Sequence, residues 1–207
     1  MKDTNSLGVG EPDFITPYHI RNAAINSIVD GETQYTPNRG LLALREEISG
    51  YLQKRYQITY DPQKEILVTV GASESIDVAL RALISDGDEV LVPEPSYVSY
   101  SPSVIFAGGT PVGVETREDT DFRLSAQRVR EAITPRTKAL ILPYPNNPTG
   151  AVMGREELEE LAQVVREREL LVISDEIYSE LTYGGEHVSF ASLPGMWPYT
   201  LTINGFS

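Results

Sequence analysis

Two patterns of apolar residues alternate along the chain. In one, apolar positions recur every three or four residues and form one face of a helix; in the other, short continuous runs are typical of buried strands. The first pattern predicts helices over residues 17–29, 40–56, 73–84, 97–107, 125–133 and 155–168. The second predicts strands over residues 65–70, 89–92, 110–115, 138–142, 170–174 and 200–204.

This alternation predicts an α/β fold: a three-layer α/β/α arrangement around a mainly parallel sheet. In sheets of this kind, ligands bind beyond the carboxyl ends of the strands. The residues that directly follow each predicted strand are therefore the candidates for a functional site.

Composition and charge narrow the classes of function. With 17 basic and 30 acidic residues the formal net charge is −13, which argues against binding to nucleic acid or to anionic membranes. The absence of cysteine excludes thiol catalysis and thiolate metal sites and fits a reducing cytoplasm. His19 and His187 lie far apart in the sequence, so we expect no histidine-based metal site. We also expect neither a signal peptide nor a membrane span, because no apolar run is long enough.

Two strand ends carry small or aromatic residues. Gly71, Ala72 and Ser73 follow the first predicted strand and open a helix, where free backbone N–H groups can bind a phosphate, although the same residues can serve only as a helix cap. Tyr97 follows the second strand in a proline-rich turn, where its ring can stack on a flat ligand or simply pack.

Two further strand ends carry polar residues. Asn147 lies in a Pro-Asn-Asn-Pro-Thr-Gly stretch, which predicts a tight loop or an amide directed at a ligand. Asp175 ends a buried apolar strand, and a carboxylate placed there must be paired. Its partner can be a metal, an arginine, a ligand cation or a helix N-terminus.

Two nucleotide-binding motifs are present only in part. Four apolar residues followed by Ser174, Asp175 and Glu176 are similar to the Walker B strand of ATPases, but the chain contains no Gly-Lys pair for the phosphate loop. Gly8 and Gly10 are not followed by the third glycine of a dinucleotide-binding fingerprint.

Five segments, taken together and in order, resemble the class I/II aminotransferases, which are fold-type I enzymes that use pyridoxal phosphate (PLP). They are residues 6–14, 35–40, 71–73, 147–150 and 174–178. The resemblance extends over essentially the whole chain and leans toward the subgroup that acts on aspartate or aromatic amino acids.

The resemblance implies a role for each residue around the cofactor ring. Asp175 would pair with the protonated pyridine nitrogen of PLP and keep the ring an electron sink. Tyr178 and Asn147 would hydrogen-bond the phenolic oxygen, and Asn147 would also contact substrate. Tyr97 would stack on the ring face, and Tyr97 and Tyr178 would support the chemistry without being the catalytic base.

The resemblance also implies the phosphate, substrate and subunit contacts. Ala72 and Ser73 would bind the phosphate of PLP. Tyr35 would reach the phosphate of the neighbouring subunit, which implies a homodimer. Gly10 would contact the carboxylate of the substrate through its backbone.

The family's catalytic lysine forms a Schiff base with PLP and matches none of the lysines in the chain. The resemblance places it directly after Ser207. It assigns residues 1–16 to a substrate loop on the small-domain side and residues 17–207 to the PLP-binding large domain, and it places the C-terminal small domain beyond the chain. The antiparallel strand that follows the lysine would also be missing, which would leave two strands facing an unfilled slot.

These expectations predict an aminotransferase that moves an amino group between an L-amino acid and a 2-oxo acid by a ping-pong mechanism. Two alternatives stay open: a PLP-dependent C–S lyase of the same fold, and a non-catalytic PLP-binding fragment.

Overall fold

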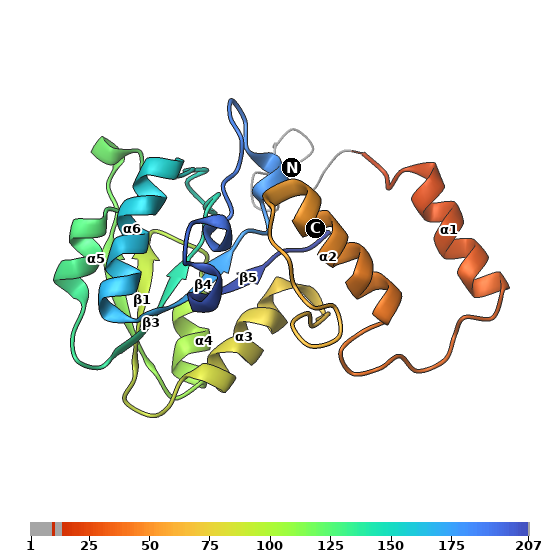
Figure 1. Cartoon of the computed structure of the whole chain (residues 1–207), viewed down its shortest axis with the longest axis horizontal. Helices are drawn as coiled ribbons and strands as arrows, with labels where there is room; N and C mark the ends of the chain where they lie inside the picture. Colours follow the sequence, from red (N-terminus) through yellow and green to blue (C-terminus); the bar gives the residue numbers. More distant parts are fainter. Residues whose placement is uncertain (1–9, 11–13, 207) are drawn as a thin grey trace, which may run out of the picture. The chain divides into compact units, whose positions relative to one another are not determined.

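A computed structural model describes residue 10 and residues 14–206 (Figure 1). The chain divides into two compact units, residues 1–38 and 39–207. The first unit contains α1 (Tyr18–Val29), a helix in which no residue is buried. Most of the predicted substrate loop at residues 6–14 lies outside the described residues, and the predicted domain boundary after residue 16 stays a prediction.

The second unit is built on a five-stranded sheet with the order β2-β1-β3-β4-β5. Every neighbouring pair of strands is parallel. The strands are β1 (Glu89–Glu94), β2 (Thr110–Glu115), β3 (Thr137–Leu142), β4 (Leu171–Asp175) and β5 (Thr200–Ile203). The predicted α/β fold with a mainly parallel sheet is confirmed.

Each predicted helix is present, most of them with ends shifted by a few residues; among the described residues, three α-helices precede the first strand and three lie between successive strands. The helices of the second unit are α2 (Leu42–Tyr56), α3 (Gly71–Leu83), α4 (Tyr100–Phe106), α5 (Ala126–Ala132) and α6 (Arg155–Arg168). Short 3-10 turns follow at η1 (Glu118–Thr120), η2 (Ser179–Leu181), η3 (Phe190–Ser192) and η4 (Trp197–Tyr199). No helix among residues 10 and 14–206 is long and apolar enough to cross a membrane.

The sheet separates two apolar cores because successive side chains of a strand point to opposite faces. Along β3, Leu140 and Leu142 belong to the core beneath α5 and α6, whereas Ala139 and Ile141 belong to the core beneath α3 and α4. All four side chains are almost completely buried. The continuous apolar run of this strand is thus explained by burial on both faces.

The predicted strand over residues 65–70 is wrong. Ile66 is buried, but Leu67 and Val70 are 49% and 89% exposed. The backbone N–H of Val68 donates to the carbonyl of Arg39, and no strand among the described residues pairs with this segment. A strand exists only through hydrogen bonds to a neighbour, so the apolar run alone does not make one.

Leu140, at the centre of the sheet, provides a test of this packing. We expect Leu140→Ala to lower the free energy of unfolding by about 2–5 kcal/mol, because it leaves a cavity in a close-packed core. Leu201→Ala in β5 is the matched control, since Leu201 is 38% exposed and its replacement should cost about 1 kcal/mol or less. Urea unfolding measures both, and equal losses would contradict the central position of Leu140.

Candidate active site

The carboxyl ends of the parallel strands bring most of the candidate residues of the second unit to one edge of the sheet. Asp175 is the last residue of β4 and is aligned with Ile203, the last residue of β5. Tyr97 follows β1 and Asn147 follows β3, on strands that neighbour each other in the sheet. These residues are distant in the sequence, and the strand order makes them neighbours.

Asp175 is the most deeply buried of the candidates, with 5% of its surface exposed. Its Oδ2 accepts a hydrogen bond from the Tyr100 hydroxyl at 2.7 Å, and its Oδ1 accepts one from the backbone N–H of Ile177 at 3.2 Å. Burial raises the pKa of Asp175, and these two hydrogen bonds oppose the rise. None of the ion pairs among the described residues includes it. Among the described residues no cation pairs with this buried carboxylate, so a ligand cation is a candidate partner.

Tyr100 was not among the residues singled out from the sequence. It is 4% exposed, and both burial and the nearby charge of Asp175 raise the pKa of its hydroxyl. The hydroxyl therefore keeps its proton and donates a hydrogen bond to the Asp175 carboxylate. The only sequence signal was a second tyrosine three residues after Tyr97, and that spacing does not reveal a partner 75 residues away.

Tyr97 lies beside this pair. Its ring centroid is 5.7 Å from that of Tyr100, with the ring planes at 77°. Tyr97 is 37% exposed, so part of its surface remains available to a ligand. The edge-to-face contact orients the Tyr97 ring next to the tyrosine that holds Asp175.

Asn146, which precedes the candidate Asn147, holds the loop after β3. Asn146 is 5% exposed; its Nδ2 donates to the carbonyl of Pro95 at 3.3 Å, and its Oδ1 accepts from the backbone N–H of Thr149 at 3.4 Å. Asn147 is exposed. Asn146 thus links the loop to the end of β1, and Asn147 is left available for a ligand.

The N-terminus of α3 has the properties of an anion site. Gly71 has a φ of +78°, which a glycine adopts without strain. The residue preceding the helix, Val70, provides no side-chain cap for the first turn. Ala72 is half-buried and Ser73 is exposed, so the backbone N–H groups of the first turn lie near a polar, accessible side chain.

The other predicted residues divide between the two units. Tyr178 is half-buried and directly precedes η2, and beyond β5 the Asn204 side chain donates to the Ser179 hydroxyl at 3.3 Å. Gly10 and Tyr35 lie in the first unit, and both are exposed. The lysine is expected directly after Ser207, the last residue of the sequence, so the structure does not include it. The roles given to all these residues stay predictions.

The family model described as aminotransferase class I and II matches residues 2–207. The chain belongs to this family. The resemblance inferred from the sequence motifs is therefore confirmed.

Individual members of the class I and II aminotransferases are similar over the full length of the chain. It is 50% identical to an aspartate aminotransferase of Pyrococcus abyssi, over 100% of the chain and 54% of that protein. It is 47% identical to an aromatic-amino-acid aminotransferase of Thermococcus litoralis, over 98% and 52%. The crystal structure of an aromatic aminotransferase from Pyrococcus horikoshii superposes with a TM-score of 0.97 at 49% identity, over 100% and 56%. The chain thus spans about half the length of the relatives it matches.

The Tyr100 hydrogen bond gives a prediction about the charge of Asp175. Tyr100→Phe removes a contact that lowers the pKa of Asp175, so we expect this pKa to rise further. Tyr97→Phe is the matched control, because it keeps the ring contact and leaves the Tyr100 donor in place. Carbon-13 NMR titration of the aspartate carboxyls measures the pKa in both variants.

The substitution Tyr100→Phe should also change how stability depends on pH. A raised carboxyl pKa means that the folded state binds the proton more tightly, so the contribution of Asp175 to stability falls as pH rises from about 3.8 through the raised pKa. In Tyr100→Phe this fall should extend to higher pH, as followed by urea unfolding across that range. An unchanged Asp175 pKa would contradict the role given to Tyr100.

Proposed function

We propose that the complete protein is a PLP-dependent aminotransferase that moves an amino group between an L-amino acid and a 2-oxo acid by a ping-pong mechanism. The observation that carries the proposal is Asp175, a buried carboxylate at the carboxyl edge of the sheet with hydrogen-bond donors but no cation among its described partners. Membership of the class I and II aminotransferase family supports the same proposal.

The residues around Asp175 fit the parts of PLP. A protonated pyridine ring supplies the cation that Asp175 lacks, and the bound cofactor supplies an electron-withdrawing ring for chemistry at the α-carbon of the amino acid. Tyr97 covers one face of the ring with its exposed surface. Tyr178 and Asn147 donate hydrogen bonds to the phenolic oxygen.

The phosphate and substrate contacts complete the proposed site. Ala72 and Ser73 hold the phosphate through their backbone N–H groups, and the Ser73 hydroxyl adds a hydrogen bond. Tyr35 from the partner in a homodimer contacts the same phosphate, and Gly10 contacts the substrate carboxylate. The site is then shared between two copies of the chain.

The strand register supports a lysine just beyond Ser207. Because Ile203 is aligned with Asp175, the chain after β5 leaves the sheet at the same edge as the Asp175 carboxylate. A lysine that follows lies within reach of a ring held by Asp175. We propose that it carries PLP and moves the proton of the α-carbon.

The names of several relatives support a proposal for the substrate class. Several relatives that are 42–50% identical are named aspartate aminotransferases, and one is named an aromatic-amino-acid aminotransferase. We propose that this protein uses an acidic or aromatic L-amino acid as the amino donor.

Replacement of Asp175 tests the proposed ring contact. Removing one member of a buried charge pair costs about 3–5 kcal/mol, so Asp175→Ala should reduce kcat/KM for transamination by about 100-fold to 4,000-fold. Asp119→Asn, at an exposed carboxylate, is the control and should leave kcat/KM unchanged. Retention of full activity by Asp175→Ala would contradict the proposal.

The position of the lysine is tested by mass. Borohydride reduction of the complete protein should fix PLP to a lysine directly after Ser207, and peptide mass mapping locates the label. Unreduced protein treated with hydroxylamine is the control and should carry none. A label on Lys138, or none, would contradict the lysine assignment, whereas release of ammonia and a thiol from a cysteine-type substrate would favour the lyase.

A further inference from the structure

Glu176 is a fully buried carboxylate for which the proposed cofactor contacts have no use. It follows Asp175 directly, yet its side chain points to the opposite face of the sheet, because side chains alternate along a strand. Asp175 contacts Tyr100 in the core beneath α3 and α4, whereas Glu176 contacts Phe190 in the core beneath α5 and α6. Glu176 is 1% exposed.

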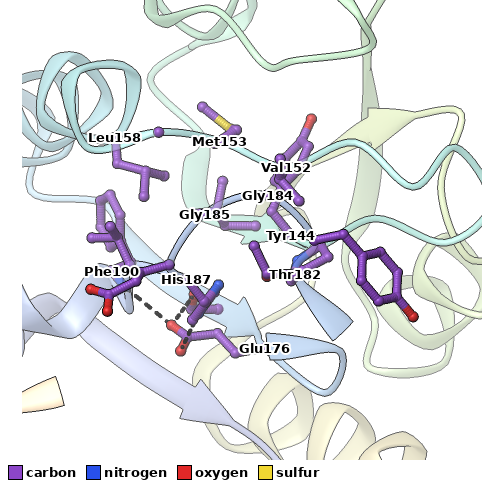
Figure 2. Close-up of a pocket in the computed structure, with 17 residues that line it drawn as sticks. Tyr144, Val152, Met153, Leu158, Glu176, Thr182, Gly184, Gly185, His187 and Phe190 are labelled. Atoms are coloured by element: carbon purple, nitrogen blue, oxygen red, sulfur yellow. Dashed lines mark hydrogen bonds and ion pairs between the residues drawn. The ribbon is translucent and has the colours of Figure 1, made fainter. Parts of the chain in front are cut away.

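Four donors hold this carboxylate, and Figure 2 shows two of them, His187 and Phe190, beside Glu176. Its Oε1 accepts from the Ser174 hydroxyl at 2.9 Å and from the Ser189 hydroxyl at 3.0 Å. The backbone N–H of Phe190 donates to the same oxygen at 3.1 Å. His187 Nε2 lies 3.0 Å from Oε2, and because a carboxylate only accepts, the shared proton belongs to Nε2.

His187 is itself fixed by a helix distant in the sequence. Its side chain is 8% exposed, and the ring of Tyr56 at the end of α2 meets it edge-on, at 5.7 Å between centroids and 81° between planes. The Glu176–His187 pair therefore connects the end of β4, the 187–190 segment and α2.

We propose that the Glu176–His187 pair is a positioning device that aims the Asp175 carboxylate at the ring nitrogen of the cofactor. The inference rests on the proposed function. Asp175 and Glu176 share one peptide unit, so any rotation of the strand end that turns the Asp175 carboxylate also turns the Glu176 side chain. That rotation would break the hydrogen bonds of a buried carboxylate, which is costly because the groups are left unsatisfied.

The backbone of Glu176 makes the last hydrogen bond between the ends of β4 and β5. The N–H of Glu176 donates to the carbonyl of Ile203 at 2.8 Å, just beyond the last aligned residues of β4 and β5. Beyond that bond the chain enters the turn that carries Tyr178. The Glu176 side chain therefore anchors the strand end where the backbone ladder stops.

A pocket of about 180 Å³ borders both members of the pair. Apolar side chains of Tyr144, Met153 and Phe190 line it together with Glu176 and His187 (Figure 2). The substitution His187→Ala would therefore open a space next to this pocket, and a small molecule could reach that space through the pocket. Chemical rescue of the missing imidazole is thus feasible.

The test compares two cofactors in the complete protein freed of PLP. The first is PLP; the second is its analogue in which a C–H group replaces the ring nitrogen, so only PLP can use the Asp175 contact. Equilibrium fluorescence gives the Kd of each. We expect wild type to bind PLP more tightly than the analogue. We expect His187→Ala and Glu176→Leu to reduce this preference, the Kd of the analogue divided by the Kd of PLP, by about tenfold. Loss of a residue that hydrogen-bonds a metal ligand has an effect of this size at metal sites.

Matched variants separate positioning from stability. Glu176→Gln retains an acceptor for Ser174, Ser189 and Phe190, and the other tautomer of His187 accepts from its amide, so the ratio should stay within about twofold of wild type. Leu193→Ala weakens the same core without touching the pair and should leave the ratio unchanged. Added imidazole should restore the ratio in His187→Ala.

The outcomes distinguish the inference from the function on which it rests. If wild type binds neither cofactor, or binds both equally, the proposed contact of Asp175 fails. If wild type prefers PLP and His187→Ala keeps the full preference while both affinities fall together, the pair is only structural and the inference is overturned. Should His187→Ala not fold, Tyr56→Leu removes the ring that orients His187 and should reduce the ratio in the same direction, by about threefold.

Discussion

The buried carboxylate of Asp175 is the constraint on which the rest of the site depends. A charge removed from water at the end of β4 is stable only with partners, and its described neighbours give it a hydroxyl and a backbone N–H. The cation is left for a ligand to supply. The protonated pyridine ring of the proposed cofactor would supply this charge.

The parallel sheet makes this arrangement possible. Strands buried on both faces place Asp175 in one core and Glu176 in the other, although the two are consecutive residues. One side of the strand end then faces the proposed cofactor, and on the other side the Glu176 carboxylate contacts His187. At the neighbouring strand end, Asn146 has a comparable role, since it fixes a loop and leaves Asn147 exposed.

Local pattern was enough to predict most of the fold and the strand ends at which the candidate residues lie. Helical spacing and apolar runs record burial, and burial determines these elements, so the five strands and the strand ends that carry Asp175 and Asn147 were expected. Residues 65–70 were predicted incorrectly, because a strand depends on a partner that an apolar run does not reveal. The bond from Tyr100 to Asp175 and the pair of Glu176 with His187 were missed, because each joins residues that only the folded chain brings together.

The central claim is that Asp175 holds a protonated ring nitrogen, and nitrogen-15 NMR tests it most directly. The complete protein would be loaded with PLP labelled at the ring nitrogen and compared with its Asp175→Asn variant. We expect the nitrogen-15 chemical shift of a protonated pyridine in wild type and that of a neutral pyridine in the variant. A neutral ring nitrogen in wild type, or the same protonated signal in both proteins, would contradict it.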